Sequence, residues 1–261
     1  MSAKITSINY CPVKSVSFQS VENCKIKKNI GIIGDRIFAF AKDLDLEQAK
    51  LFEKSPAERK GKWNKVLTLK NSPALNKYNF IFKEEKLTLT FKDNEILSID
   101  INQSTEREAL SNKISELESS LKQPITLMKN NAFPFFDTSI SKKVDFVNSV
   151  SLLNFQSIND FEKKVGKKIE TSIFRGNICI DGLEPWKERE WIGKTIKINN
   201  VSFKVEKNIP RCVAINLKPK TDDNSFNLLQ LLKKNYNHFD MGIYLTALDD
   251  GEINIENTIE L

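Results

Sequence analysis

Histidine and closely spaced cysteines are scarce in this sequence of 261 residues. His238 is the single histidine, and the four cysteines (Cys11, Cys24, Cys179 and Cys212) form no C-x-x-C pair. The usual zinc and iron–sulfur spacings are therefore missing, and chemistry that depends on several histidines is disfavoured. The nine glycines form no Walker or dinucleotide-binding loop, which argues against those phosphate-binding folds.

Long apolar runs are also missing. No stretch approaches the length of a membrane span, and no apolar region follows the charged N-terminus as it would in a signal peptide. The 40% hydrophobic and 28% charged content is ordinary for a globular protein. We therefore expect a cytoplasmic protein without a membrane partner, long enough for one large domain or two modest ones.

The net charge of +6 comes mainly from lysine. It suits an anionic ligand, but it also suits a lysine-rich solvated surface, and composition alone leaves both open. The lysines are spread along the chain rather than forming a stripe interleaved with aromatic residues, so we expect no nucleic-acid partner.

Many short strands and a few helices are predicted. Alternating or compact apolar segments predict strands at residues 4–9, 37–41 and 66–69, and hairpins at 87–99 and 195–205. Apolar residues at helical spacing predict helices at 105–122, 155–165 and 226–236. Thr105 and Glu108 have the spacing of a capping box, Gly166 is expected to stop the second helix, and Pro124 marks the best domain boundary.

Three polar segments lie next to apolar strands: Tyr10–Ser15, Phe174–Gly182 and Pro210–Cys212. Lys14 and Ser15 follow a turn that Pro12 restricts. They could hold a phosphate, or they could belong to a solvated loop. Arg175 could read a planar heterocycle or a phosphate, or could be structural and paired with Asp181 or Glu184. The guanidinium of Arg211 favours a reactive thiolate at Cys212, whereas the general expectation for a cysteine is a buried, inert thiol.

These segments, taken in order, resemble the MOSC family. The N-terminal part resembles the β-barrel domain that precedes MOSC in many members, through Pro12–Ser15, Gly34–Phe38 and Leu67–Lys70. The MOSC part is marked by Phe174–Ile178, Asp181–Trp186, Glu190–Gly193, Arg211–Cys212 and Pro219–Thr221. Each motif is loose alone, and their order over almost the whole chain is more specific.

The resemblance implies a mainly β fold with some α, that is, an α+β protein with two β-barrel-like domains at residues 1–123 and 124–261. It also implies a molybdenum–molybdopterin cofactor, with Cys212 as the metal ligand and catalytic residue. The cofactor contacts that it implies are Lys14, Ser15, Arg36, Asn148, Ser149, Arg175, Asn177 and Arg211.

The activity that the resemblance implies is reduction of small N-hydroxylated compounds. The chain has no set of cluster-binding cysteines like that of bacterial relatives with an added ferredoxin domain, so electrons are expected from a separate ferredoxin-like or flavoprotein partner. The sulfurase of the family carries a pyridoxal-phosphate domain, for which this chain has no room. Two alternatives stay open: a carrier of sulfur as a Cys212 persulfide or of the cofactor itself, and a pair of barrels that serves only for interaction.

Overall fold

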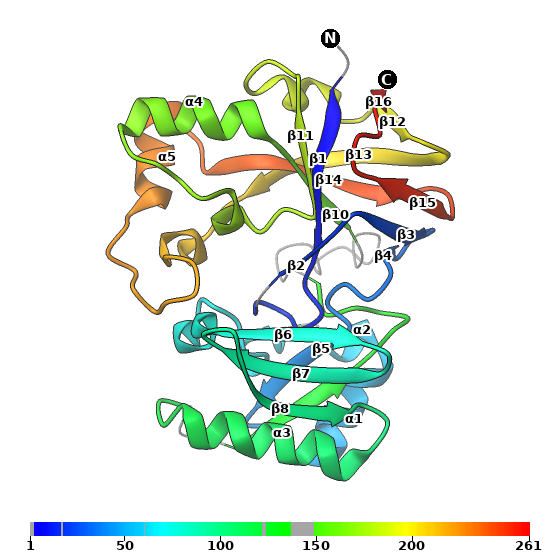
Figure 1. The fold of residues 1–261 in the computed structure, drawn as a ribbon, viewed down its shortest axis with the longest axis vertical. Coiled ribbons are helices and arrows are strands. Elements are labelled where there is room, and N and C mark those ends of the chain that lie inside the picture. The colour runs from blue at the N-terminus through cyan, green and yellow to red at the C-terminus, as the bar shows by residue number, and fades with distance from the viewer. Residues whose placement is uncertain (1–2, 17, 60, 122–123, 137–148) are drawn as a thin grey trace.

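The computed structural model describes residues 3–16, 18–59, 61–121, 124–136 and 149–261 (Figure 1). The fold is mixed α+β with curled, half-barrel sheets, which confirms the predicted fold class. The upper part in Figure 1 contains both termini, the largest sheet and helices α4 and α5. The lower part contains strands β5 to β9 and helices α1 to α3.

The largest sheet has eight strands in the order β16-β12-β13-β14-β10-β11-β1-β2. All its neighbours pair antiparallel except β10 and β11, which are parallel. Its strands are β1 Lys4–Tyr10, β2 Gln19–Val21, β10 Val150–Asn154, β11 Ile178–Asp181, β12 Thr195–Ile198, β13 Val201–Pro210, β14 Asp240–Ala247 and β16 Ile259–Glu260. Three smaller sheets are formed by β15 Gly251–Asn254, β3 Asn23–Lys27 and β4 Gly31–Ile32; by β5 Phe38–Lys42 and β9 Ile125–Lys129; and by β6 Tyr78–Lys83, β7 Lys86–Phe91 and β8 Asn94–Asp100.

Helices cover the sheets of both parts. The α-helices are α1 Leu46–Lys54, α2 Pro56–Arg59, α3 Ser104–Leu117, α4 Phe155–Val165 and α5 Leu228–Tyr236, and the short 3-10 helices are η1 Trp63–Lys65, η2 Pro73–Lys77, η4 Thr171–Phe174, η5 Lys187–Trp191 and η6 Val213–Asn216. None of the helices among the described residues is both long enough and apolar enough to cross a lipid bilayer.

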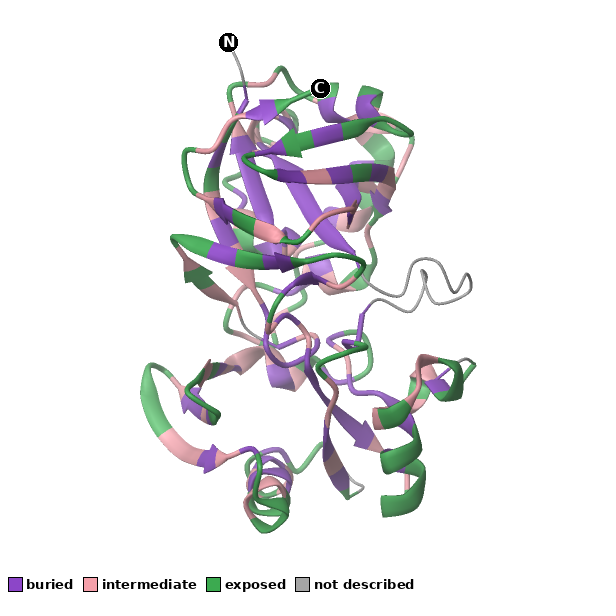
Figure 2. Cartoon of the chain, turned by 90° about the vertical axis from the view of Figure 1, so that its right-hand side faces the viewer, coloured by how far each residue is buried: buried purple, intermediate pink, exposed green. Residues whose placement is uncertain are grey.

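Strand β5 lies between two apolar layers, which explains why its sequence is apolar at every position but the last. Phe38 and Phe40 pack into the core with β6, β7 and α3, while Ala39 and Ala41 face the core that includes α1. Alternate side chains of a strand point to opposite faces, so burial of both faces requires a continuous apolar run. Figure 2 shows this strand pair, β5 and β9, buried between more exposed helices.

Strand pairing crosses the predicted boundary between residues 123 and 124. Strand β1 pairs with β11, and β3 pairs with β15, so the first strands of the chain belong to sheets of the upper part. Strand β9, just after the boundary, pairs with β5 of the lower part. The two-domain division stays a prediction, because strands from both sides of residue 123 are paired with one another in each part.

Most of the predicted helices and hairpins are present. Helix α4 has the predicted bounds, and Gly166 ends it with a φ of 65°. The hairpins β7–β8 and β12–β13 are confirmed. Helix α5 begins two residues later than predicted.

Two local predictions were wrong. Thr105 does not cap the third helix, because the N-cap is Gln103 and the helix already includes Ser104; the helix ends at Leu117 because Glu118 turns to bind Tyr78 and Lys77. Residues 66–69 form no strand beyond a single bridge from Val66 to Ala41. Asn71 binds the backbone at Thr68 and Val66 and so curls this segment into a turn.

A buried carboxylate, Glu188, fixes the start of α4 against η5. It accepts hydrogen bonds from Ser157 Oγ at 2.8 Å and Asn154 Nδ2 at 2.9 Å and is fully buried. Burial raises the pKa of Glu188 above its usual 4.5, while the hydrogen bonds from Asn154 and Ser157 lower it by less. A carboxyl whose pKa is raised by folding stabilises the fold most below its unfolded pKa.

We therefore expect the stability of the native protein relative to Glu188→Gln to fall as the pH rises above 4.5, through the raised pKa of Glu188. Urea unfolding of both proteins at a series of pH values measures this difference. A matched Glu190→Gln substitution on the same 3-10 helix, where the carboxylate is exposed, is the control. A stability difference that does not change with pH would contradict the assignment.

Candidate cofactor site

A cluster of charged and polar groups joins the upper and lower parts around the thiol of Cys11. We call it the junction cluster, and it comprises Cys11, Lys14, Asp35, Arg36, Ser151, Arg175 and Asn177. Burial raises the pKa of the Cys11 thiol, and the positive charges of Arg175, Arg36 and Lys14 oppose that rise. The structure thus brings together four of the residues predicted to contact a cofactor: Lys14, Arg36, Arg175 and Asn177.

Asp35 is the acidic member of the junction cluster and ties three segments together. One carboxylate oxygen accepts the backbone N–H of Cys11 at 2.7 Å. The other accepts from Asn177 Nδ2 at 3.3 Å and pairs with the guanidinium of Arg36. This buried carboxylate therefore balances part of the positive charge and sets the position of Arg36.

Asn177 is fully buried, and the hydrogen bonds of its amide join three segments of the chain. Its Oδ1 accepts hydrogen bonds from the backbone N–H and the hydroxyl of Ser151, at 3.1 and 2.8 Å, and its Nδ2 donates to the carbonyl of Asn9 at 3.1 Å. Arg36 Nη1 also lies 3.4 Å from Oδ1. The amide joins β1, β10 and the segment before β11, so its donors and acceptors are already used within the protein.

Arg175 does not pair with Asp181 or Glu184, which was the alternative to a ligand-binding role. Its Nη2 donates to the Val16 carbonyl at 2.9 Å and to Cys11 Sγ at 3.1 Å, and its guanidinium lies 4.6 Å from the ring centre of Phe18. Burial lowers the pKa of Arg175, with the positive charge of Arg36 adding to the effect. A desolvated cation of this kind favours an anionic neighbour.

The glycine that follows Arg175 is required by packing. A Cβ on Gly176 would lie 2.4 Å from Leu153 Cδ1, so any side chain here would displace the buried side chain of Leu153 in β10. The close contact between Gly176 and Leu153 holds the backbone between Arg175 and Asn177 against β10.

Three residues of the predicted site have backbones in the left-handed region: Ser15 at a φ of 62°, Arg36 at 52° and Arg175 at 52°. Residues other than glycine adopt this region at a cost of roughly 1–2 kcal/mol each. Other examples in this chain, such as Asn199, lie in hairpin turns where the geometry demands it. Arg175 is the C-cap of the 3-10 helix η4, where a left-handed backbone is common, and Ser15 and Arg36 lie in turns.

Lys14 and Ser15 follow the proline-restricted turn, as predicted. Lys14 is buried, its backbone N–H donates to the Phe38 carbonyl at 2.7 Å, and its Nζ lies 5.8 Å from the ring centre of Trp63. Ser15 is half-buried. The turn is therefore fixed to β5 and carries its lysine inward rather than into solvent.

Cys212 differs from the other three cysteines. It is exposed at the end of β13 and precedes η6, whereas Cys11, Cys24 and Cys179 are buried. The guanidinium of Arg211 donates to the backbone carbonyls of Phe174, at 2.6 Å, and of Met241. Arg211 thus fixes the Cys212 backbone next to the residue that precedes Arg175, and the thiol is accessible to a reactant.

Ser149 lies at the start of β10 and is buried, and its hydroxyl has no hydrogen-bond partner among the described residues. A buried hydroxyl without a partner costs about 1–3 kcal/mol, so a ligand oxygen there would be favourable. The other predicted contact in this segment, Asn148, lies outside the described residues.

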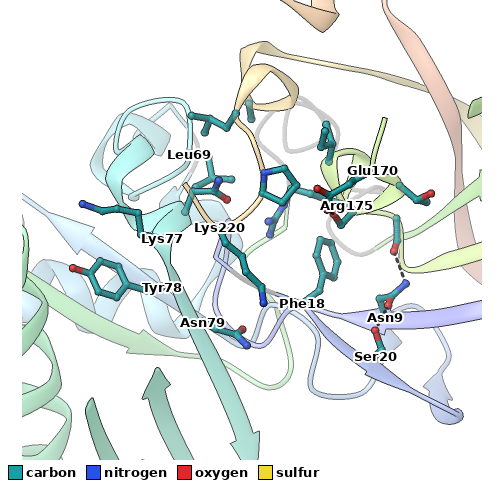
Figure 3. Close-up of a pocket in the computed structure, with 18 of the residues that line it drawn as sticks. Asn9, Phe18, Ser20, Leu69, Lys77, Tyr78, Asn79, Glu170, Arg175 and Lys220 are labelled. Atoms are coloured by element: carbon teal, nitrogen blue, oxygen red, sulfur yellow. Dashed lines mark hydrogen bonds between the residues drawn. The ribbon is translucent and has the colours of Figure 1, made fainter. Parts of the chain in front are cut away.

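A cavity of about 700 Å³ lies beside the junction cluster, and Arg175 forms part of its wall. In Figure 3 the side chains of Lys77 and Tyr78 lie on one side of the cavity and those of Glu170 and Arg175 on the other, with Phe18 next to Arg175. Ala214 and Leu217, which follow Cys212 in the chain, also line it.

Asp35, Cys11 and Ser151 complete the junction cluster and were not predicted from the sequence. Asp35 and Cys11 stand inside segments that were singled out, and an aspartate between Gly34 and Arg36 was a usable signal for a charge partner. Nothing in the sequence indicates Ser151, because its contact with Asn177 joins residues 26 positions apart.

Comparison with known proteins identifies the C-terminal part. Residues 144–260 match the family model of the MOSC domain. Slightly less than half of the chain is therefore similar to the MOSC domain. The MOSC domain contains Cys212, Arg211, Arg175 and Asn177, and the predicted resemblance is confirmed for this part of the chain.

One curated relative and two solved structures are similar to this chain. Mitochondrial amidoxime reducing component 2 of Bos taurus is 28% identical over 92 residues, which cover 35% of this chain and 27% of the relative. The YuaD protein of Bacillus subtilis has a TM-score of 0.45 at 11% identity, covering 99% of this chain and 94% of that one. YiiM of Geobacillus stearothermophilus has a TM-score of 0.34 at 14% identity, covering 42% and 52%.

Proposed function

We propose that this chain binds a molybdenum–pterin cofactor, with the Cys212 thiolate as the protein ligand of the metal. The observation that carries the proposal is the exposed position of Cys212, beside the fixed Arg211 and inside the matched domain. A thiolate is a soft metal ligand, and an accessible thiol can reach a metal that arrives with its own sulfur ligands.

The remaining residues fit the rest of such a cofactor. Lys14, Arg36 and Arg175 bring three positive charges to the junction cluster against the single carboxylate of Asp35, a balance that suits a phosphate or a pterin edge. The Ser149 hydroxyl, which has no hydrogen-bond partner among the described residues, offers a further hydrogen bond.

We further propose that the chain is a reductase of small N-hydroxylated compounds that receives electrons from a separate ferredoxin-like or flavoprotein partner. The bovine relative, an amidoxime reducing component by name, supports this activity, although the match spans about a quarter of that protein. The bound cofactor would supply the two-electron chemistry that removes oxygen from an N–OH group. The chain itself would anchor, orient and electrostatically balance the cofactor.

The test is expression in a host that makes the cofactor, followed by measurement of molybdenum content and of benzamidoxime reduction with an artificial electron donor. We expect stoichiometric molybdenum and turnover to benzamidine. Protein from the same host with cofactor synthesis disabled is the control and should show neither. Molybdenum without turnover, or sulfur that cyanide releases from Cys212, would instead support a carrier, and complete absence of both molybdenum and releasable sulfur would refute both.

A further inference from the structure

The cavity beside Arg175 is separate from the residues assigned to the cofactor, apart from Arg175 itself. Its walls come from the lower part of the molecule, including Leu69, Asn79 and Lys92, and from the upper part, including Ile173 and Leu217. Ligand sites in proteins are often cavities of roughly 300–1,000 Å³ between two structural parts, so its volume of about 700 Å³ is in the range that holds a small molecule.

One wall of the cavity is held in place by contacts across the two parts. Asn76 Nδ2 donates to the backbone carbonyls of Lys218 at 2.8 Å and Thr221 at 2.7 Å. Lys77 pairs with Asp222 at 3.7 Å, and Lys220 pairs with Asp93 at 3.7 Å. The loop after η6 is therefore fastened to the lower part, and the cavity is a built feature of the fold.

The charges on the cavity wall are unbalanced. Of the four cations that line it, Lys77 and Lys220 are paired with carboxylates. Lys92 and Arg175 take part in no ion pair within the described residues, and both lie against phenylalanine rings. Against these two positive charges stands Glu170, the lining carboxylate that has no basic partner in the described part of the chain.

Apolar surface accompanies these charges. Leu69, Ile173 and Leu217 are nearly buried residues that contribute to the wall, and the ring of Phe18 lies under the guanidinium of Arg175. A ligand with an anionic end and an apolar body would satisfy both features. A neutral polar ligand would leave the apolar wall unused, and a cation would face Lys92 and Arg175.

We propose that this cavity binds a small organic anion, with a carboxylate, sulfonate or phosphate end held by Lys92 and Arg175 and an apolar body against Phe18, Leu69 and Leu217. Arg175 also donates a hydrogen bond to Cys11 in the junction cluster. A ligand that contacts Arg175 from the cavity would therefore touch a residue that the cofactor site shares. Binding at this site requires no molybdenum, so it can be tested on cofactor-free protein whether or not the proposed function is correct.

The test is fluorescence titration of the full chain, purified without cofactor, with anilinonaphthalene sulfonate. We expect saturable binding of one equivalent that 2-naphthoate displaces and that 2-naphthylmethylamine, a cation of similar size, does not. Lys92→Glu should weaken binding of the probe by about tenfold or more, because it places a negative charge at the anionic end.

The matched control is Lys83→Glu, the same charge reversal on an exposed lysine of the same sheet outside the cavity. Its affinity for the probe should stay within twofold of the native value. Leu217→Trp, which fills the cavity, should abolish binding in a protein whose thermal unfolding shows that it is folded. Equal weakening by both lysine variants, equal displacement by the amine, or no saturable binding would overturn the proposal.

Discussion

Cys212→Ala is expected to abolish benzamidoxime reduction while leaving the fold intact. The thiol is the single protein group assigned to the metal, and loss of an outer partner of a metal ligand already costs roughly 10–100-fold in affinity or activity, so loss of the ligand itself should cost more. The side chain is exposed, and substitutions at exposed positions usually change stability by less than about 0.5 kcal/mol. Turnover and the unfolding temperature, measured on the same preparation, separate the two effects.

Cys24→Ala is the control for this experiment, because Cys24 lies in β3, is buried among apolar residues and is not one of the residues that form the junction cluster. It should lose some stability and keep its turnover per molybdenum. Native turnover in Cys212→Ala would refute the assigned role. If Cys212 carries sulfur instead, the same substitution removes the cyanide-releasable sulfur, and the molybdenum content of the two proteins stays equal.

Local elements were predictable from the sequence where one amphipathic face and one clear stop signal coincide. Helix α4 shows both: Ile158 and Phe161 face the core, and Gly166 takes the left-handed conformation that ends the helix. The segment from Val66 to Leu69 shows the limit. Its apolar residues are buried as a strand's would be, yet Asn71 captures the backbone and turns the chain. Burial alone therefore did not distinguish a strand from a turn.

Pairing between distant segments could not be predicted from one sequence. Nothing in β1 or β3 indicates that they join β11 and β15, at least 170 and 225 residues later in the chain. Family resemblance nevertheless selected Arg36, Arg175 and Asn177, which these pairings bring into contact at the junction cluster. What it missed was the support for these residues, because the contacts of Asp35 and Ser151 exist only after the two parts of the chain have met.

The role of Asn177 is where the structure most sharpens the expectation of a cofactor contact, and it yields the last prediction. Its amide binds the backbone and hydroxyl of Ser151 and the carbonyl of Asn9, all in the protein interior. Asn177→Leu keeps the number of side-chain heavy atoms but removes the acceptor of the Ser151 N–H and hydroxyl and the donor to the Asn9 carbonyl. Each buried polar group left unsatisfied costs about 1–3 kcal/mol, so we expect a total loss of about 4 kcal/mol.

For a chain of this size, 1 kcal/mol corresponds to about 2–4 °C, so the unfolding temperature of the cofactor-free variant should fall by about 10 °C. Asn224→Leu makes the same chemical change on an exposed loop residue and should leave the unfolding temperature nearly unchanged. The decisive comparison uses protein without cofactor. If Asn177 mainly contacts the cofactor, the cofactor-free variant will unfold at the native temperature and lose only its ability to bind molybdenum. If Asn177 instead joins the three segments through its hydrogen bonds, the unfolding temperature will fall even in the absence of cofactor.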